Sequence, residues 1–430
     1  MKTQTILLLL PHLDLGGGAR RIKSYCDYLD RSKFRVVIAV MSESVVRNID
    51  EVIRRKTPRI VTSDLEQIAL FAKRQKVTVL YTWYDGQFDP LLWELLSKLK
   101  KSGIKLIGNN VFSYYDEKMD YIFDLTLFQT KMMFEIKFKK SCPRDHQFPD
   151  HKYAILPNPV NSSYFHQFQI SLYKRSLLRK SLGFSRKDCV VGRFGRNDIV
   201  KWGDLLFISL IKLRYHPRIK FLIIGMPRSR RFILGILQFI FPKLQKTIRV
   251  LMPTKNDKIL MEYIQCVDIV GHAVKIGEGC SNAINECMFW RKPIITNSSP
   301  HCDNGQIEQV DHQENGYIAQ TNGEWTSILE LLAAKPTLRE KWGSHARTKV
   351  LRTIESRIVV REFEELIKMV LNLPYKFTRI HVKKSDLKTF SLWYDNFIKF
   401  HKVSRDSRIV MFFRTFKRII DYIEYRTWNG

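Results

Sequence analysis

The residues best suited to chemistry lie in the segment Gly277-Glu-Gly-Cys-Ser-Asn-Ala-Ile-Asn-Glu286. Its two carboxylates, Glu278 and Glu286, are eight positions apart across a glycine-containing turn. Ser281 or Asn282 can cap a helix that begins there, which places Glu278 on the loop and Glu286 about one and a half turns into the helix. Carboxylates accept paired hydroxyl hydrogen bonds, and free N–H groups between them can hold phosphates. The alternative is two charges that complement the helix dipole.

A second segment, Val191-Gly-Arg-Phe-Gly-Arg-Asn-Asp-Ile-Val-Lys-Trp-Gly203, concentrates positive charge. A predicted strand ends here in a loop that carries Arg193, Arg196 and Lys201. Three cations at the carboxyl end of a strand suit a diphosphate whose negative charge grows as a bond breaks. The alternative for this segment alone is a solvated basic loop.

A third segment, Leu15-Gly-Gly-Gly-Ala-Arg-Arg21, is rich in glycine and joins a predicted strand to a predicted helix. Glycines let backbone N–H groups approach a phosphate or a sugar, and the start of a helix favours negative charge. The spacing is not G-x-G-x-x-G, and no acidic residue follows in the ribose-binding register, which argues against a nicotinamide cofactor. A tight strand–helix turn explains the glycines equally well.

The elements that position these loops alternate between short apolar strands and helices. In the first half the predicted strands are Thr5–Leu10, Phe34–Val40, Val77–Thr82 and Ile104–Ile107; in the second half the apolar runs include Cys189–Phe194, Phe221–Gly225, Ile248–Met252, Ile264–Val270 and Pro293–Asn297. Continuous apolar strands indicate a parallel sheet covered on both faces. The linker Ile155-Leu-Pro-Asn-Pro-Val160 separates the two series. We therefore predict two doubly wound α/β domains that share a cleft at the carboxyl ends of their strands.

The expected boundaries follow from this alternation. An N-terminal Rossmann-like domain covers residues 1–165, a C-terminal Rossmann-like domain covers residues 166–373, and a basic, aromatic-rich helical tail covers residues 374–430.

Taken in order, these segments resemble the retaining GT-B glycosyltransferases of family 4. The likeness runs from Ile6 to about Ala319 and is carried by the following pieces: Gly16-Gly17-Gly18, Leu156–Asn161, Gly192–Lys201, the strand Phe221–Gly225, the Glu-x7-Glu element, Arg291–Thr296, and Asp303–Glu308 with Asn315-Gly316. The resemblance implies an enzyme that moves a sugar, with retention of configuration, from a nucleoside diphosphate sugar to a glycan or lipid-linked acceptor. Surface polysaccharide or lipopolysaccharide biosynthesis is the process expected by analogy.

The resemblance also implies roles for individual residues. Glu278 would contact the donor sugar hydroxyls, Glu286 the ribose hydroxyls, and Arg196 and Lys201 the departing diphosphate, with Arg193 as the alternative arginine. The remaining donor-binding positions are Gly17 and Gly18 from the first domain, and Gly279, Cys280, Ser281 and Asn282 from the second. No metal and no cofactor besides the donor is expected, because two cations and a helix N-terminus can stabilise the diphosphate.

One position departs from the family. Many relatives carry a histidine after the fourth N-terminal strand, where this chain reads Ile107-Gly-Asn-Asn-Val-Phe112, so that Asn109 or Asn110 takes its place. His12 and His272 lie near predicted strand ends, and we interpret both as structural.

Composition constrains the location of the protein and its partners. The seven cysteines are scattered without a C-x-x-C pair, which is typical of reduced thiols in the cytoplasm. The run Ile6–Leu10 indicates a buried strand rather than a signal peptide. No stretch reaches the ~18–20 apolar residues that span a bilayer. With 72 Lys and Arg against 42 Asp and Glu, and basic apolar segments at Pro227–Phe241 and in the tail, we expect peripheral attachment to the anionic inner face of the cell membrane. The alternative is that these apolar faces pack on the domains.

Two other classes compete for these features. Nucleic acid also suits a basic protein, but no RRM, KH, zinc-finger or helix-turn-helix pattern occurs, so we expect no nucleic-acid partner. A GT-B-type nucleotide-sugar epimerase or phosphorylase would share much of the scaffold, and only the product distinguishes it.

Overall fold

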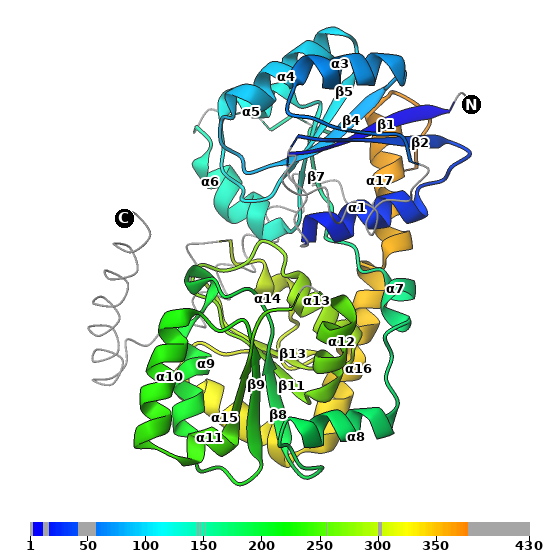
Figure 1. Ribbon diagram of the computed structural model, residues 1–430. Helices are drawn as coiled ribbons and strands as arrows, with labels where there is room; N and C mark the ends of the chain where they lie inside the picture. Colours follow the sequence, from blue (N-terminus) through cyan, green and yellow to red (C-terminus); the bar gives the residue numbers. More distant parts are fainter. Residues whose placement is uncertain are drawn as a thin grey trace.

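The computed structural model describes residues 3–11, 17–41, 57–143, 146, 148–149, 151–254, 256–299 and 303–376. They form two α/β domains, one above the other in Figure 1, and each is built on its own parallel sheet. The expected fold class of two Rossmann-like doubly wound domains is thus confirmed. The predicted tail lies outside the described residues from residue 377 onward.

The first sheet has seven strands in the order β3-β2-β1-β4-β5-β6-β7. Its strands are β1 (Gln4–Leu10), β2 (Phe34–Val40), β3 (Arg59–Val61), β4 (Val79–Tyr84), β5 (Lys105–Asn110), β6 (Leu125–Phe128) and β7 (Tyr153–Ile155). The helical segments are α1 (Gly17–Tyr28), α3 (Leu65–Arg74), α4 (Pro90–Lys101), α5 (Glu117–Ile122), η2 (Met133–Phe138) and α6 (Lys139–Ser141). β1 is apolar from Ile6 to Leu10 because both faces are covered there: Ile6 and Leu8 enter one core, and Leu7 and Leu9 enter another.

The second sheet has six strands in the order β10-β9-β8-β11-β12-β13. Its strands are β8 (Cys189–Arg193), β9 (Ile219–Ile224), β10 (Ile248–Leu251), β11 (Ile269–His272), β12 (Ile294–Thr296) and β13 (Gly316–Ile318). The helical segments between and after them are α7 (Ser162–His166), α8 (Leu172–Ser181), η3 (Ile199–Lys201), α9 (Asp204–Lys212), α10 (Arg228–Ile240), α11 (Lys243–Thr247), α12 (Asp257–Cys266), α13 (Asn282–Phe289), α14 (Gln306–Gln309), α15 (Asn322–Ala334), α16 (Pro336–Thr353) and α17 (Ser356–Val370). The apolar run Ile264–Val270 is not one strand, because it contains the buried end of α12 and the start of β11.

The chain crosses between the domains twice, and the two crossings lie side by side. The N–H of Val160 donates to the carbonyl of Ile354 at 2.8 Å, and the N–H of Ser356 donates to the carbonyl of Val160 at 3.0 Å. After the second crossing, α17 runs along the first domain (Figure 1). Phe363 is buried there and stacks on Tyr25 of α1 with ring centroids 4.3 Å apart. The expected range 166–373 for the second domain therefore does not describe α17, whose packing partners lie in the first core.

Candidate active site

The site lies where the strand order of each sheet reverses. In the first sheet this point falls between β1 and β4, and in the second between β8 and β11. Loops on either side of such a point diverge and leave a crevice at the carboxyl ends of the strands. The segments after β1, β8 and β11, which the sequence singled out, all begin there, and α1, α13 and α14 lie between the two sheets (Figure 1).

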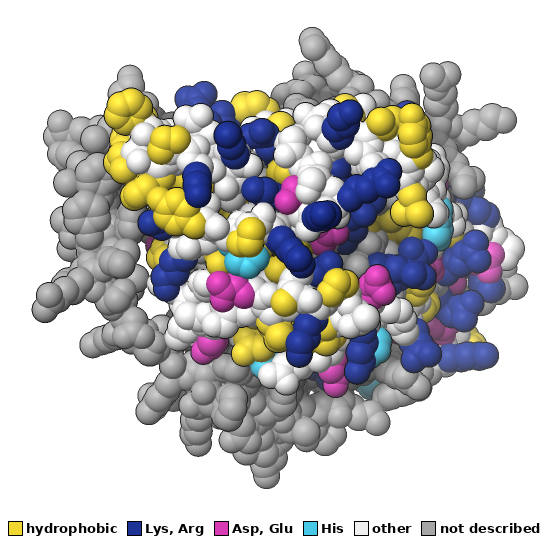
Figure 2. Space-filling model, turned by 90° about the horizontal axis from the view of Figure 1, so that it is seen from below, with side chains coloured by type: hydrophobic (Ala, Val, Ile, Leu, Met, Phe, Trp, Pro, Cys, Tyr) yellow, Lys and Arg dark blue, Asp and Glu magenta, His cyan; other side chains and the backbone are white. Residues whose placement is uncertain are grey.

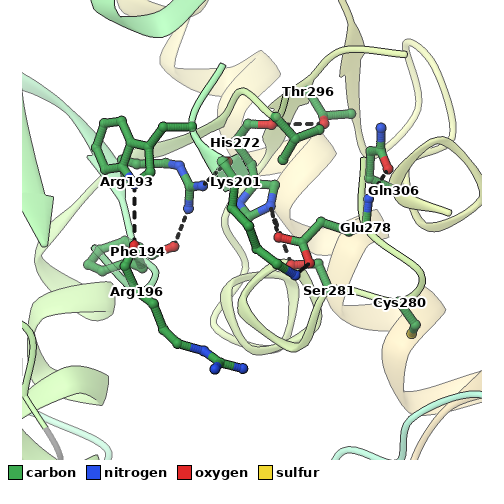
Figure 3. Close-up of polar contacts among 12 residues, drawn as sticks. Arg193, Phe194, Arg196, Lys201, His272, Glu278, Cys280, Ser281, Thr296 and Gln306 are labelled. Carbon is green, nitrogen blue, oxygen red and sulfur yellow. Dashed lines mark hydrogen bonds and ion pairs between the residues drawn. The ribbon is translucent and has the colours of Figure 1, made fainter. Parts of the chain in front are cut away.

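Glu278 is the centre of a small charged cluster (Figure 3). Its Oε2 lies 3.0 Å from Nζ of Lys201, and its Oε1 lies 3.4 Å from Nε2 of His272. Burial acts to raise the pKa of this carboxyl, but the hydrogen bond from His272 and the charge of Lys201 outweigh it, and the pKa falls to about 2. Glu278 is therefore an ionised carboxylate at neutral pH, with 14% of its side chain exposed.

His272 ends β11 and is buried beneath this cluster. Burial, together with the charge of Arg193, lowers the pKa of its imidazole to about 4. A neutral imidazole can donate to a carboxylate only from the nitrogen that bears hydrogen, so the contact with Glu278 requires the hydrogen on Nε2. The backbone carbonyl of His272 accepts from Oγ1 of Thr296 at 2.9 Å, which ties it to β12. His272 thus holds Glu278, a role that sequence reasoning missed although its place at a strand end pointed to the site.

Ser281 stands at the N-cap position of α13, but its side chain forms no cap hydrogen bond. Its Oγ lies 3.3 Å from Nε2 of His272, and its N–H donates to Oε1 of Gln309 at 2.8 Å. Capping by the Ser281 side chain, one of the two expectations, is therefore wrong, because the hydroxyl turns towards His272. The first turn of α13, which begins at Asn282, keeps N–H groups without a side-chain cap, and the helix dipole there favours an anion.

Glu286 is held by an ion pair across the domains. It is buried in α13 and contacts the guanidinium of Arg20 from α1. Arg20 also lies 2.6 Å from Oδ1 of Asp257 at the start of α12. Glu286 is thus in the site but paired, whereas the resemblance implied a carboxylate open to ribose. Sequence reasoning missed Arg20, although a cation in the first turn of a helix, where the dipole disfavours it, was a readable signal.

The two arginines of the basic loop differ sharply. Arg193 is buried at the end of β8, donates to the carbonyls of Phe194 and Lys201, and lies 5.1 Å from the centre of the Trp202 ring. Burial lowers its pKa to about 10. Arg193 therefore shapes the loop from inside, while the side chain of Arg196 is exposed and ends below the Glu278 cluster in Figure 3.

The segment 303–309 braces the loop that carries Glu278. Oε1 of Gln306 accepts from the N–H of Glu278 at 3.0 Å, and the N–H of Gly305 donates to the carbonyl of Glu278 at 2.6 Å. A Cβ atom on Gly305 would lie 1.8 Å from the carbonyl oxygen of Gly279, so only glycine fits. Nε2 of Gln309 donates to the Ser281 carbonyl at 2.9 Å. The loop is thus fixed by side-chain amides, and one of them, Gln306, lies in the segment Asp303–Glu308 that the sequence analysis singled out.

The first domain contacts the same loop. Oγ1 of Thr130 donates to the carbonyl of Gly279 at 3.1 Å, and a Cβ on Gly279 would lie 2.7 Å from Sδ of Met133. Nδ2 of Asn158 donates to the carbonyl of Cys280 at 3.1 Å, and burial raises the pKa of the Cys280 thiol. The predicted positions 279–282 therefore lie at the boundary between the domains.

On the first-domain side, Gly17 begins α1, and a Cβ on Gly18 would lie 3.4 Å from the Trp83 ring. Of the two asparagines that end β5, Asn110 is occupied with its own loop: it accepts from the N–H of Ser113 at 2.6 Å and donates to the carbonyl of Tyr114 at 2.8 Å. Asn109 is buried, and its Oδ1 has no hydrogen-bond partner within the described part of the chain. His12 and Gly16 lie outside the described residues.

The described residues contain neither a metal-ligand cluster nor a helix that could span a membrane. No set of three or more His, Cys, Asp or Glu side chains there is arranged to hold a metal ion. Within the same residues, no helix is both long enough and apolar enough to cross a bilayer.

Comparison with known proteins settles the fold. The chain matches no protein-family model and no curated protein sequence. A glycosyltransferase from Rickettsia africae ESF-5 matches with a TM-score of 0.70 at 15% identity, over 86% of this chain and 99% of that one. Anabaena Alr3699/HepE in complex with UDP matches with a TM-score of 0.67 at 14% identity, over 85% and 100%.

The fold is GT-B. A further GT-B structure, the lipopolysaccharide outer core galactosyltransferase WaaB, matches with a TM-score of 0.57 at 12% identity, over 85% of this chain and 99% of that one. The same two-domain scaffold thus extends over almost the whole described chain. The cluster around Glu278 lies on the second domain of this fold, and Glu286 of the neighbouring helix α13 pairs with Arg20 of α1 in the first.

Proposed function

We propose that this protein is a retaining glycosyltransferase of family 4 that moves a sugar from a nucleoside diphosphate sugar to a glycan or a lipid-linked acceptor. The observation that carries the proposal is the ionised Glu278 beside Lys201 and the start of α13, at the strand ends of a GT-B fold. One of the matching structures holds UDP. The process proposed is the assembly of surface polysaccharide or lipopolysaccharide, by a cytoplasmic enzyme at the inner face of the cell membrane.

The chemistry follows from the charges in the cluster. Glu278 would accept hydrogen bonds from donor sugar hydroxyls, because its low pKa keeps both oxygens as acceptors. Lys201 and Arg196 would bind the diphosphate, whose negative charge grows as the sugar becomes oxocarbenium-like. Removing one such stabilising donor costs ~10²–10³ in turnover in other enzymes. Glu286 can bind ribose hydroxyls, as proposed, only if its ion pair with Arg20 opens or if the carboxylate contacts the ribose and Arg20 together.

A thermal-shift panel of UDP-, GDP- and ADP-sugars tests the proposal, with NAD and a short oligonucleotide as controls. A ligand at ~100 times its Kd stabilises a protein by about 2.7 kcal/mol. We expect one nucleotide sugar to raise the Tm, and Lys201→Met to abolish the shift while Lys180→Met on the distant α8 preserves it. A shift by the oligonucleotide alone, or an unchanged sugar response in Lys201→Met, would contradict the proposal.

Product analysis separates the transferase from a GT-B epimerase or phosphorylase. Proton NMR of the reaction with the identified donor reports the configuration at the anomeric carbon of the product. A glycoside with the donor's configuration is expected. An epimerised nucleotide sugar, or a free sugar phosphate, would identify one of the alternatives instead.

A further inference from the structure

Helix α10 turns large apolar side chains towards solvent. Phe232 is 67% exposed, Ile236 41%, Phe239 87% and Ile240 56%. The spacing i, i+4, i+7 and i+8 places all four on one face of the helix. An apolar stripe of this kind normally faces a core, and an exposed one marks an interaction surface.

The surroundings of this face are strongly basic. Between Asp204 and Asp257 the chain has eleven Lys or Arg among 52 residues and no Asp or Glu. Arg228 on α10, and Lys243 and Lys246 on α11, have exposed side chains. The underside of the molecule likewise presents hydrophobic side chains with Lys and Arg beside them (Figure 2). The stripe is therefore bordered by positive charge from the same stretch of chain.

Several cations are packed directly on exposed or half-buried apolar groups of this stretch. The guanidinium of Arg214 lies 4.5 Å from the ring centres of both Tyr215 and Phe241, and Nζ of Lys243 lies 5.1 Å from that of Tyr215. Arg231 contacts Sδ of the exposed Met252 at 3.1 Å. Apolar groups next to cations are typical of an interfacial surface, in which rings enter the acyl boundary and cations stay with the phosphates.

We propose that α10 and α11 form a docking face for an anionic phospholipid bilayer. Phe232 and Phe239 would enter the headgroup region, and Arg228, Lys243 and Lys246 would contact lipid phosphates. The charge argues against the chain's own tail as the occupant, because residues 377–430 contain twelve Lys and Arg and only five Asp and Glu. An anionic bilayer complements the face in both polarity and charge.

This inference rests on the proposed function and deepens it, since a lipid-linked acceptor would bring the enzyme to a membrane. The observations behind the inference lie on the α10 surface and not in the donor site. The test is co-sedimentation of the full-length chain with vesicles of phosphatidylglycerol and phosphatidylcholine in equal parts, or of phosphatidylcholine alone. We expect binding only to the anionic vesicles, and its release by salt, because ~1 M salt shortens the screening length to about 3 Å.

Two variants probe the two components of the face. Phe232→Ser/Phe239→Ser removes the exposed rings, and Lys243→Glu/Lys246→Glu reverses two charges. Each reversed lysine is expected to weaken vesicle binding at least about fivefold, the equivalent of ~1 kcal/mol. Matched controls on the first domain are Tyr121→Ser, which removes an exposed ring, and Lys73→Glu/Lys101→Glu; both should bind as the unaltered chain does.

Other occupants give distinct results. If the α10 and α11 variants bind normally and Phe412→Ser/Phe413→Ser does not, the tail is the membrane contact and the proposal is wrong. Equal binding to neutral and to anionic vesicles would overturn the proposal as well. So would a chain that binds no vesicles but forms dimers, if only the α10 variant dissociates these dimers. The nucleotide-sugar thermal shift of each variant should match that of the unaltered chain, so a failed donor assay and a failed vesicle assay remain separate findings.

Discussion

Replacing Glu278 by Gln should remove a defined part of the free energy of unfolding. The side chain keeps its shape but loses the charge that Lys201 contacts at 3.0 Å. The pKa of Glu278 falls from 4.5 to about 2 on folding. At ~1.36 kcal/mol per unit, that difference corresponds to roughly 3 kcal/mol of stability near neutral pH. Glu278→Gln is therefore expected to be less stable by about this amount.

The pH dependence gives the prediction its sign. A carboxyl whose pKa is depressed in the folded state contributes stability above its unfolded pKa and loses it as the pH falls through the folded pKa. The difference between the unaltered chain and Glu278→Gln should thus be complete above about pH 5 and reduced to roughly half near pH 3. Urea unfolding of both proteins at a series of pH values measures this difference directly.

Glu135→Gln is the matched control, because burial raises the pKa of that carboxyl rather than lowering it. The free energy of unfolding of Glu135→Gln should not fall below that of the unaltered chain by an amount that disappears in acid. Equal stability of Glu278→Gln and the unaltered chain at neutral pH, or a difference that grows as the pH falls, would refute the assignment of Glu278 as a buried, ion-paired carboxylate.

Three further substitutions separate structural from binding roles. Arg193→Met should lower the free energy of unfolding by ~1–3 kcal/mol, because its guanidinium donates to buried carbonyls, yet preserve the donor thermal shift; a lost shift at full stability would instead make it a diphosphate ligand. Gly305→Ala should destabilise the chain and abolish the donor shift, since its Cβ would overlap the Gly279 carbonyl, whereas Gly235→Ala, with nothing within 4 Å, should not destabilise. Arg20→Ala should lower the Tm of the free protein and tighten donor binding in calorimetry, because Glu286 no longer has to leave an ion pair. Weaker donor binding in that variant would mean that Arg20 itself contacts the donor.

The two-sheet fold could be predicted because the signals for it are local. Ile6–Leu10 and Val36–Val40 are continuous apolar runs, as strands of a sheet covered on both faces require. The sequence analysis assigned Glu278 and Lys201 to one donor only through the family resemblance. In the structure the two residues come from loops after the neighbouring strands β8 and β11. Strand neighbours at a point of reversal bring their loops together whatever the loops contain.

The features that could not be predicted depend on contacts between residues far apart in the sequence. An amphipathic helix such as α17 does not reveal which of two similar apolar sheets it will cover, and Phe363 fits against the first. The amides of Gln306 and Gln309 brace residues 28 positions earlier, and such polar contacts have no periodicity to read. The Arg20–Glu286 pair depends on how closely the domains approach, which neither segment encodes alone.

The return of α17 to the first domain has a consequence for synthesis of the chain. The ribosome completes the strands of the first sheet at Ile155, but Phe363 and Ile367, which close one of its cores, emerge about 200 residues later. The second sheet and α16 have emerged by then, so the second domain can complete its core before the first. A nascent chain paused before α17 should therefore expose the apolar side of α1 and β1, where chaperones bind. The domain translated first is then the last to become native.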